Sequence, residues 1–360
     1  VMRNADLEAE PLVLDGLMAK VLRTTLLQAT DIIPLLAGIV VAPLFFLALL
    51  HPFKRKSIAD FRWAILLMWV STAFGLAIVV TFVLMALFAP LLASNEPTKR
   101  VARPHQPPSV ELVMGSNRMG HDLWAQFTSG ARISLMVGFG AGLLVCALAI
   151  TVGITAGYFG GVVDECLTFL MNVVLVIPNL PLLLVLASFI GEASPTVIAL
   201  IIGFTSWAYG ARVIRAQTLA LREKEFVIAA EVLGEPAWRI ILVEILPNLI
   251  SIIGVSFIGS IIYAIVTEAT LEFLGLGDPT VVSWGIMLYN AQTSSAILVG
   301  AWWEILAPCF AIATLGAGLA MLNFAIDEIA NPQLRSHKGL RRWKQLAAPV
   351  PPIAAQEKTA

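Results

Sequence analysis

The stretch FVIAAEVLGEPAWRIILVEILPN, residues 226–248, is a polar-edged segment in a chain that is otherwise suited to a lipid bilayer. The 360 residues are 58% hydrophobic and only 13% charged, and their mean hydropathy is +0.86. Soluble domains carry roughly 25% charged residues, so this composition predicts a membrane protein. A polar-edged segment between apolar stretches predicts a loop outside the bilayer, onto which another molecule docks.

Seven stretches without Asp, Glu, Lys or Arg are long enough to cross a hydrocarbon core of about 30 Å, which needs about 20 helical residues. A buried charge costs about 2.5–3.5 kcal/mol at the centre of an inserting helix, so repeated exclusion of charge favours membrane helices. The short alternating segments of a membrane barrel are not the pattern here. We predict an all-α, polytopic helical bundle whose spans lie within residues 32–53, 63–95, 133–163, 166–191, 193–211, 245–267 and 305–326.

The chain divides into three predicted parts. Residues 1–61 form an N-terminal segment with a transmembrane helix at about 32–50, which lacks a small-residue cleavage site and is followed by Pro52 and a basic cluster. Residues 62–335 form the main transmembrane domain, with a polar loop at about 219–247. Residues 336–360 form a tail whose Pro and Ala content predicts disorder.

Basic residues predict the orientation of the bundle. Lys and Arg stay on the cytoplasmic side of short loops, and an even number of predicted spans separates the three basic clusters, so all three are placed in the cytoplasm with the C-terminus. Arg212 and Arg215, spaced i and i+3, are expected to share one helix face and reach lipid headgroups. This orientation places the loop before residue 133 outside. The basic residues in that loop favour the opposite orientation. The clusters are Lys54, Arg55, Lys56 and Arg62; Arg212, Arg215, Arg222, Lys224 and Arg239; and Arg335, Lys338, Arg341, Arg342 and Lys344, while Lys99, Arg100, Arg103, Arg118 and Arg132 lie in the outside loop.

The polar loop has a predictable local structure. Residues 219–233 have helical character, and Gly234 is placed to end that helix as a C-terminal cap. Pro236 suits the first turn of a new helix, and Pro247 marks re-entry into the membrane. Ala229 and Ala230 lie near the bend, where small side chains let another surface approach closely. The alternative is a simple cytosolic connector between two spans, in which the alanines only favour helix formation.

Two further groups of residues are candidates for a solute path. Asn172, Pro178, Asn179 and Pro181 interrupt the fourth predicted span, and irregular membrane backbone is tolerated where it is buried in protein or lines a cavity. A kink that only shapes helix packing explains them equally. The loop at 268–304 carries acidic residues. Three of them could border an outer gate, contact a binding protein or simply face solvent. These are Glu268, Glu272 and Asp278.

The sequence gives little support for an enzymatic function. It contains no G-x-x-x-x-G-K-[ST] phosphate loop and no H-E-x-x-H pair, so we expect neither ATP hydrolysis nor a metal site in this chain. Small hydroxyls in membrane helices are more typical of packing and hydrogen bonding than of nucleophiles. A transporter or channel without ATPase partners is the main alternative function, and a membrane enzyme a more distant one.

The polar loop resembles the EAA loop of permeases in ATP-binding cassette (ABC) importers, with Ala229, Ala230, Gly234, Leu246 and Pro247 on the pattern. From about residue 62 to 335 the chain resembles the C-type subunit of the dipeptide, oligopeptide and nickel permease family. Three separated segments carry this resemblance in the right order. They are MGSNRMGHDLWAQFTSGARISLMVG at 114–138, AGYFGGVVDE at 156–165 and EATLEFLGLGDPTVVSWGIML at 268–288.

The resemblance implies a type I ABC importer permease in a bacterial or archaeal cytoplasmic membrane. It implies a B-type permease, two ATPase subunits that hold ATP and Mg²⁺, an extracytoplasmic solute-binding protein and surrounding lipid as partners, with no nucleic acid. Ile228 and Glu244 depart from the EAA pattern, and the helix at 32–50 is additional to the usual six, which places the N-terminus outside. Peptides, nickel complexes and sugars are all open as cargo. The implied ATPase-coupling residues are Ala229, Ala230, Glu231, Gly234, Glu235, Pro236, Leu246 and Pro247.

Overall fold

A computed structural model describes residues 58–93 and 95–330 of the chain. Throughout those ranges the chain forms helices joined by turns and loops, and extended pairing is limited to isolated bridges such as Arg100 with His121. The all-α prediction is therefore confirmed. The helix predicted at about 32–50 and the tail at 336–360 lie outside the described residues, so both stay predictions.

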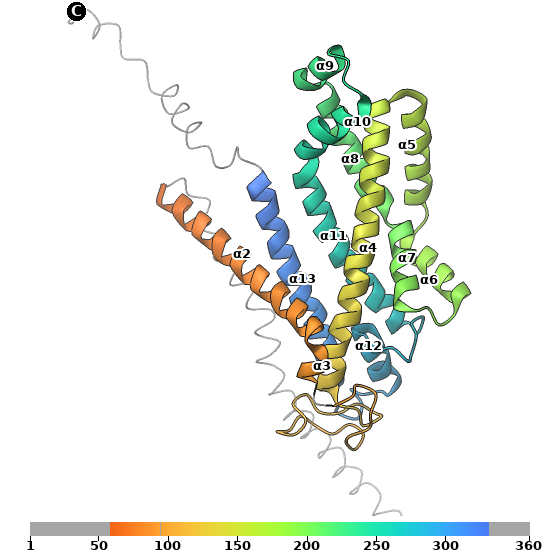
Figure 1. Ribbon diagram of the computed structural model, residues 1–360. Helices are drawn as coiled ribbons and strands as arrows, with labels where there is room; N and C mark the ends of the chain where they lie inside the picture. The colour runs from red at the N-terminus through yellow and green to blue at the C-terminus, as the bar shows by residue number, and fades with distance from the viewer. Residues whose placement is uncertain (1–57, 94, 331–360) are drawn as a thin grey trace, which may run out of the picture. The chain divides into compact units, whose positions relative to one another are not determined.

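The chain divides into two units at residues 70 and 71. The described part of the first is the beginning of α2, and the second contains the rest of the described chain (Figure 1). The helices are α2 (Ile58–Leu87), α3 (Ala89–Leu92), α4 (Leu123–Phe159), α5 (Gly161–Val176), α6 (Asn179–Ile190), α7 (Pro195–Thr205), α8 (Trp207–Arg222), α9 (Glu225–Val232), α10 (Ala237–Arg239), the π-helix η2 (Ile240–Ile245), α11 (Leu246–Phe273), α12 (Trp284–Thr293) and α13 (Trp303–Ala330).

Four segments are long and apolar enough to cross a membrane unaided: residues 69–87, 123–159, 237–273 and 303–326. Two bent pairs, α5 with α6 and α7 with α8, pass the same test together, which gives up to six spans among the described residues. These six coincide with the last six charge-free stretches of the sequence.

Several helices extend further than the charge-free stretches. α4 has 37 residues, which is about 55 Å at 1.5 Å per residue, so Arg132 lies inside it rather than in the preceding loop. Likewise α11 continues to Phe273 and contains Glu268 and Glu272, which were expected in a loop. A bilayer core needs only about 20 helical residues, so the outer turns of a span can carry charge.

The long helix α4 is the centre of the second unit and packs along α7, α8 and α11. Close approach to α11 depends on Gly142, where an added Cβ would lie 2.8 Å from Ile261 Cγ1 and 3.2 Å from Ile261 N. Gly153 allows a similar approach to Ala211 and Ile214 on α8. Small residues at such contacts let helix backbones come together in a membrane.

We predict that Gly142→Val destabilises the protein by about 1–3 kcal/mol, because the new side chain overpacks the α4–α11 contact. Gly140→Val is the matched control, since an added Cβ at Gly140 has no neighbouring heavy atom within 4 Å in the described chain. The thermal unfolding midpoint of each purified variant in detergent measures the effect. Equal midpoints for the two variants would contradict the close packing.

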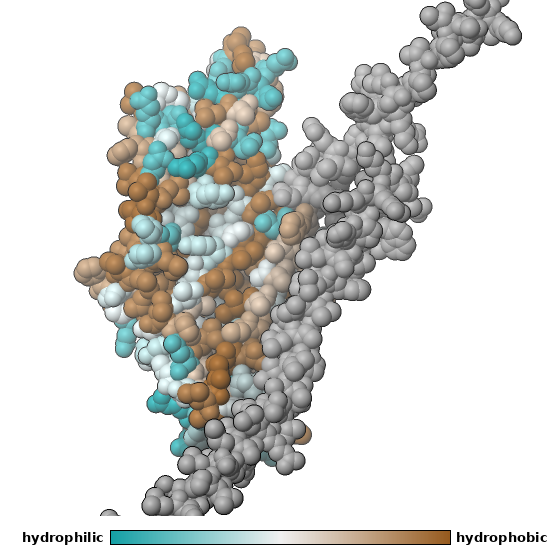
Figure 2. Space-filling view, turned by 180° about the vertical axis from the view of Figure 1, so that it is seen from behind, coloured by the Kyte–Doolittle hydropathy of each residue, from teal (hydrophilic) through white to brown (hydrophobic). Residues whose placement is uncertain are grey.

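The second unit has two distinct ends. Figure 1 shows α9 and α10 at one end of its helical bundle and α12 at the opposite end. On the face seen in Figure 2, hydrophobic side chains dominate the middle and hydrophilic ones gather at the end that carries α9 and α10. We call these the α9 end and the α12 end.

Candidate functional site

Between the end of α8 and the start of α11, the polar loop forms helix α9, a glycine turn, the short helix α10 and the π-helix η2. α8 ends at Arg222 and α9 begins at Glu225, so the single helix expected over residues 219–233 is in fact two. Val227 is fully buried in a cluster that includes residues of α4 and α8, and this contact holds α9 against the bundle.

Gly234 ends α9 as the sequence predicts. Its φ is +77°, and its N–H donates to Glu231 O at 3.0 Å while the N–H of Glu235 donates to Ala230 O at 3.1 Å. These two bonds are the Schellman pattern, in which a glycine takes the left-handed conformation that other residues resist. Pro236 then lies immediately before α10, one position earlier than predicted.

Residues that the sequence places in the coupling loop are accessible at this turn. Ala229, Glu231, Gly234 and Pro236 are exposed, and an added Cβ at Gly234 has no neighbouring heavy atom within 4 Å in the described chain. Ala230 and Glu235 are half-buried. The structure thus leaves room for a partner surface close to the backbone of the turn.

Large apolar side chains also surround this turn, a feature not predicted from the sequence. Val232 is 81% exposed, Leu233 82% and Trp238 65%, and Leu242 and Val243 on η2 are also exposed. Exposed apolar groups among polar ones mark interaction surfaces in soluble parts of proteins. The signal available in the sequence was the pairing of Val232 and Leu233 with nearby charges, just before the stretch at 237–273 that is apolar enough to span the membrane.

The return of the chain to the bundle begins with Leu246 and Pro247, in the first turn of α11. Pro247 has no N–H to donate to Val243, four residues earlier, and the preceding turns form η2 rather than a regular α-helix. The side chain of Asn248 donates to Glu244 O at 2.6 Å. Leu246 is half-buried and Pro247 exposed.

The break predicted in the fourth stretch is present. α5 and α6 meet at 82° between Val176 and Asn179, where Pro178 precedes the first residue of α6. Asn179 accepts a hydrogen bond from Tyr263 Oη at 3.0 Å and donates to Ser206 Oγ at 3.5 Å. Ser206 marks the second bend, a 40° change between α7 and α8.

Other members of the predicted path lie along α5 and α6. Asn172 Oδ1 accepts from Arg212 Nη2 at 2.6 Å, and Pro181 is exposed in the first turn of α6. Asn172 and Asn179 therefore have different partners, on α8 and on α11, and the structure does not gather all four predicted residues at one point.

At the α12 end, Glu268 and Glu272 are 0% and 1% exposed. Glu268 accepts from Ser134 Oγ on α4 at 3.1 Å, and Glu272 accepts from Ser283 Oγ, just before α12. Solvent contact was one of the roles considered from the sequence. That hypothesis is wrong for both carboxyl groups, because α11 continues far enough to place them in the interior. They instead join α11 to α4 and to the start of α12.

Asp278 is the member of the acidic set that remains accessible, half-buried in the loop after α11. Hydrogen bonds from the Thr280 hydroxyl and then from the Thr280 N–H hold the pKa of the Asp278 carboxyl below its ordinary value. Asp278 therefore stays charged at neutral pH.

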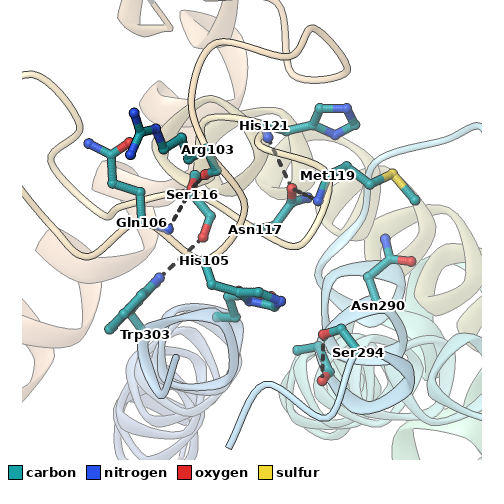
Figure 3. A network of polar contacts seen from close by, with 12 residues as sticks. Arg103, His105, Gln106, Ser116, Asn117, Met119, His121, Asn290, Ser294 and Trp303 are labelled. Atoms are coloured by element: carbon teal, nitrogen blue, oxygen red, sulfur yellow. Dashed lines mark hydrogen bonds and ion pairs between the residues drawn. The ribbon is translucent and has the colours of Figure 1, made fainter. Parts of the chain in front are cut away.

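A folded loop, residues 95–122, covers part of the α12 end (Figure 3). His105 Nδ1 lies 2.6 Å from Glu304 Oε1 at the start of α13, and Trp303 Nε1 donates to Ser116 O at 3.2 Å. Ser116 Oγ in turn donates to Arg103 O at 2.6 Å. Asn117 Oδ1 accepts from the backbone N–H groups of Met119 and His121. These bonds fix the loop on α13 through its own polar groups.

Comparison with known proteins identifies the family to which this chain belongs. The family described as the binding-protein-dependent transport system inner membrane component matches residues 149–336, and the N-terminal transmembrane domain of oligopeptide transport permease C matches residues 72–108. The chain belongs to this family of transport permeases. Three similar proteins align with this chain over most of their own length. They are a putative peptide transport system permease of Brucella suis (33% identical, 72% of this chain and 87% of that one), the dipeptide permease DppC of Bacillus subtilis (31%, 72% and 81%) and the oligopeptide permease OppC of Bacillus subtilis (30%, 72% and 85%).

In this permease, the two arginines expected to face lipid headgroups are paired within the protein. Arg215 binds the carboxylate of Asp164 on α5 through two nitrogens, with Nη2 at 2.6 Å from Oδ2, and Arg212 binds Asn172. Both interactions join α8 to α5. The i, i+3 spacing correctly placed them on one face, but it could not identify the helix they meet.

Two residues that join distant helices were not singled out from the sequence. Tyr263 is one of only four tyrosines and lies in a charge-free stretch, so its polar tip was an available signal. Trp284 is fully buried and contacts Phe82 and Phe127, but nothing in its sequence neighbourhood distinguishes it from an interfacial tryptophan. Among residues 58–93 and 95–330, no three His, Cys, Asp or Glu side chains group as metal ligands.

Proposed function

We propose that this permease subunit works in an ATP-driven importer that carries peptides or a related small solute. A second, B-type permease encloses the other half of the path. Two ATPase subunits, which hold ATP and Mg²⁺, dock on the polar loop, and an extracytoplasmic binding protein delivers the cargo. The α9 end then faces the cytoplasm of a bacterial or archaeal cell, with the C-terminus on the same side.

The observation that carries this proposal is the exposed apolar surface around the Gly234 turn. Exposure of two adjacent large apolar side chains, Val232 and Leu233, is unfavourable in a loop that contacts only solvent and favours contact with a partner. Val227 fixes α9 to the bundle, so a force applied at the turn is transmitted to α8 and α11 rather than absorbed by a flexible connector. We propose the following residues for coupling to the ATPases: Ala229, Ala230, Glu231, Gly234, Glu235, Pro236, Leu246 and Pro247.

The remaining site residues support a path and an outer gate. Asn172, Pro178, Asn179 and Pro181 line the path at the broken span. Glu268 and Glu272 hold α11, α4 and α12 together beside the outer gate, and their burial leaves no carboxylate surface for a binding protein. Asp278 is accessible and charged, which suits contact with that protein.

The test is uptake of a radiolabelled dipeptide into vesicles that contain the assembled transporter, with purified binding protein outside and ATP inside. Uptake is expected to require both ATP and the binding protein. Omitting either one is the control. Equal uptake without ATP, driven by an ion gradient, would support the secondary-transporter alternative and contradict the proposal.

A further inference from the structure

Three uncharged polar side chains from three separate segments meet where both bent spans break. Tyr263 on α11 donates to Asn179, the first residue of α6, and Asn179 donates to Ser206 between α7 and α8. We call these three residues the amide station. Tyr263 is 17 residues beyond Leu246 and ten before Phe273, so the station lies well inside the span formed by α11.

The station is exposed rather than enclosed by its own chain. Tyr263 is 40% exposed, and Asn179 and Ser206 are half-buried. Each break also interrupts helical hydrogen bonding, and polar backbone at membrane depth is tolerated only where it is buried in protein or lines a water-filled cavity. A lipid-facing position is therefore unfavourable for the remaining hydrogen-bonding groups of these side chains. The choice is between the solute path and a dry contact with the second permease.

The chemistry of the station favours the path. Tyr263 Oη retains acceptor capacity, Asn179 Nδ2 retains a second hydrogen, and the Ser206 hydroxyl can both donate and accept. No ionised group belongs to the set, so it offers little selectivity for a carboxylate or an ammonium group. Donors and acceptors side by side match an amide, which carries one N–H and one C=O.

We infer that Tyr263, Asn179 and Ser206 form a water-accessible station in the translocation path that hydrogen-bonds amide groups of the passing cargo. The inference rests on the proposed importer function and specifies the cargo chemistry that this path recognises. It implies recognition of the peptide backbone rather than of side chains, which lets one path carry peptides of different sequence.

Accessibility is the first test. Cysteine is introduced as Tyr263→Cys or Ser206→Cys in a chain whose native Cys146, Cys166 and Cys309 are replaced by alanine, and the assembled complex is treated with a negatively charged, membrane-impermeant methanethiosulfonate. Leu76→Cys on α2 is the matched control, since Leu76 is 51% exposed and lies in a segment apolar enough to cross a membrane.

Only a hydrated thiolate reacts readily, so the station cysteines should react at least about tenfold faster than the Leu76→Cys control. The comparison is made without nucleotide and with the ATPases trapped in the ATP-bound state. Rates equal to that of the control in both states, for both station variants, would overturn the inference and indicate a dry interface.

Cargo chemistry is the second test. Uptake of a labelled tripeptide and of its backbone N-methylated analogue is measured for the wild type and for Tyr263→Phe, using one binding protein throughout so that its own preference cancels in the ratio. Uptake of the parent peptide should fall roughly three- to tenfold, the size of one hydrogen bond, with a smaller fall for the analogue. Equal falls for both peptides would overturn amide recognition.

The importer function and the amide station can be contradicted separately. A wild-type complex without ATP-dependent uptake contradicts the importer, whereas the cysteine rates still report whether the station is wet. A wild-type complex with normal uptake and unreactive station cysteines contradicts only the station.

Discussion

Gly234→Trp is expected to lower transport-linked ATPase activity of the assembled complex at least about tenfold, a loss of about 1.4 kcal/mol or more in coupling. An added Cβ at Gly234 meets no heavy atom of the described chain within 4 Å, although a φ of +77° strains any side chain at this position. The indole occupies the space in which a docked ATPase would contact the turn. Peptide uptake and ATP hydrolysis by reconstituted complex measure the loss.

Two controls separate blocked docking from backbone strain. Gly191→Trp is a harsher test of backbone strain, because Gly191 has φ +80° and ψ −123° with open space at its Cβ position, and it ends α6 outside the polar loop. Gly234→Asn keeps a residue that tolerates the left-handed conformation, at the usual cost of about 1–2 kcal/mol or less. Both variants should retain coupling. Full activity of Gly234→Trp, or an equal loss in Gly191→Trp, would count against a closely seated loop.

Trp284→Ala is expected to have the largest effect on stability, about 3–5 kcal/mol. The indole is fully buried, meets Phe82 edge-on at a centroid distance of 5.6 Å, and donates from Nε1 to Phe127 O at 3.1 Å. Gly130 makes room for it, since an added Cβ there would lie 2.9 Å from Trp284 Cδ1. Removing the ring leaves a cavity where α2, α4 and α12 meet.

The measurement is thermal unfolding of the purified variant, for which the expected loss corresponds to a fall of roughly 6–20 °C in Tm. Trp238→Ala is the matched control, because Trp238 is 65% exposed and its removal creates no cavity. A Tm within a degree or two of the wild type for Trp284→Ala would show that the indole does not hold these helices together.

The features that the sequence predicted well are those set by local chemistry. Charge exclusion over about 20 residues located the six described spans, because the cost of a buried charge acts on every stretch separately. Pro178 located a break because proline cannot continue the preceding helix, and Gly234 located a cap because glycine takes positive φ without strain. Each of these conclusions needs only one segment of chain.

Features that depend on contacts between distant segments could not be predicted in the same way. Whether Arg215 faces lipid or Asp164 is decided by the packing of α5 on α8, and the burial of Glu268 by how far α11 continues beyond the charge-free stretch. The meeting of Tyr263, Asn179 and Ser206 requires three helices to be positioned first. The exposed apolar surface at Val232 and Leu233 likewise emerged only once Val227 was seen to occupy the buried face of α9.

The most direct test of the central claim is to purify the tagged chain from its native membranes in mild detergent and identify the proteins that accompany it by mass spectrometry. An importer permease should bring a second permease and ATPase subunits, and Gly234→Trp should reduce the recovered ATPases while leaving the second permease in place. Repeated recovery of the intact chain alone, in detergents that preserve known membrane complexes, would contradict the importer and favour a transporter that works without ATPase partners.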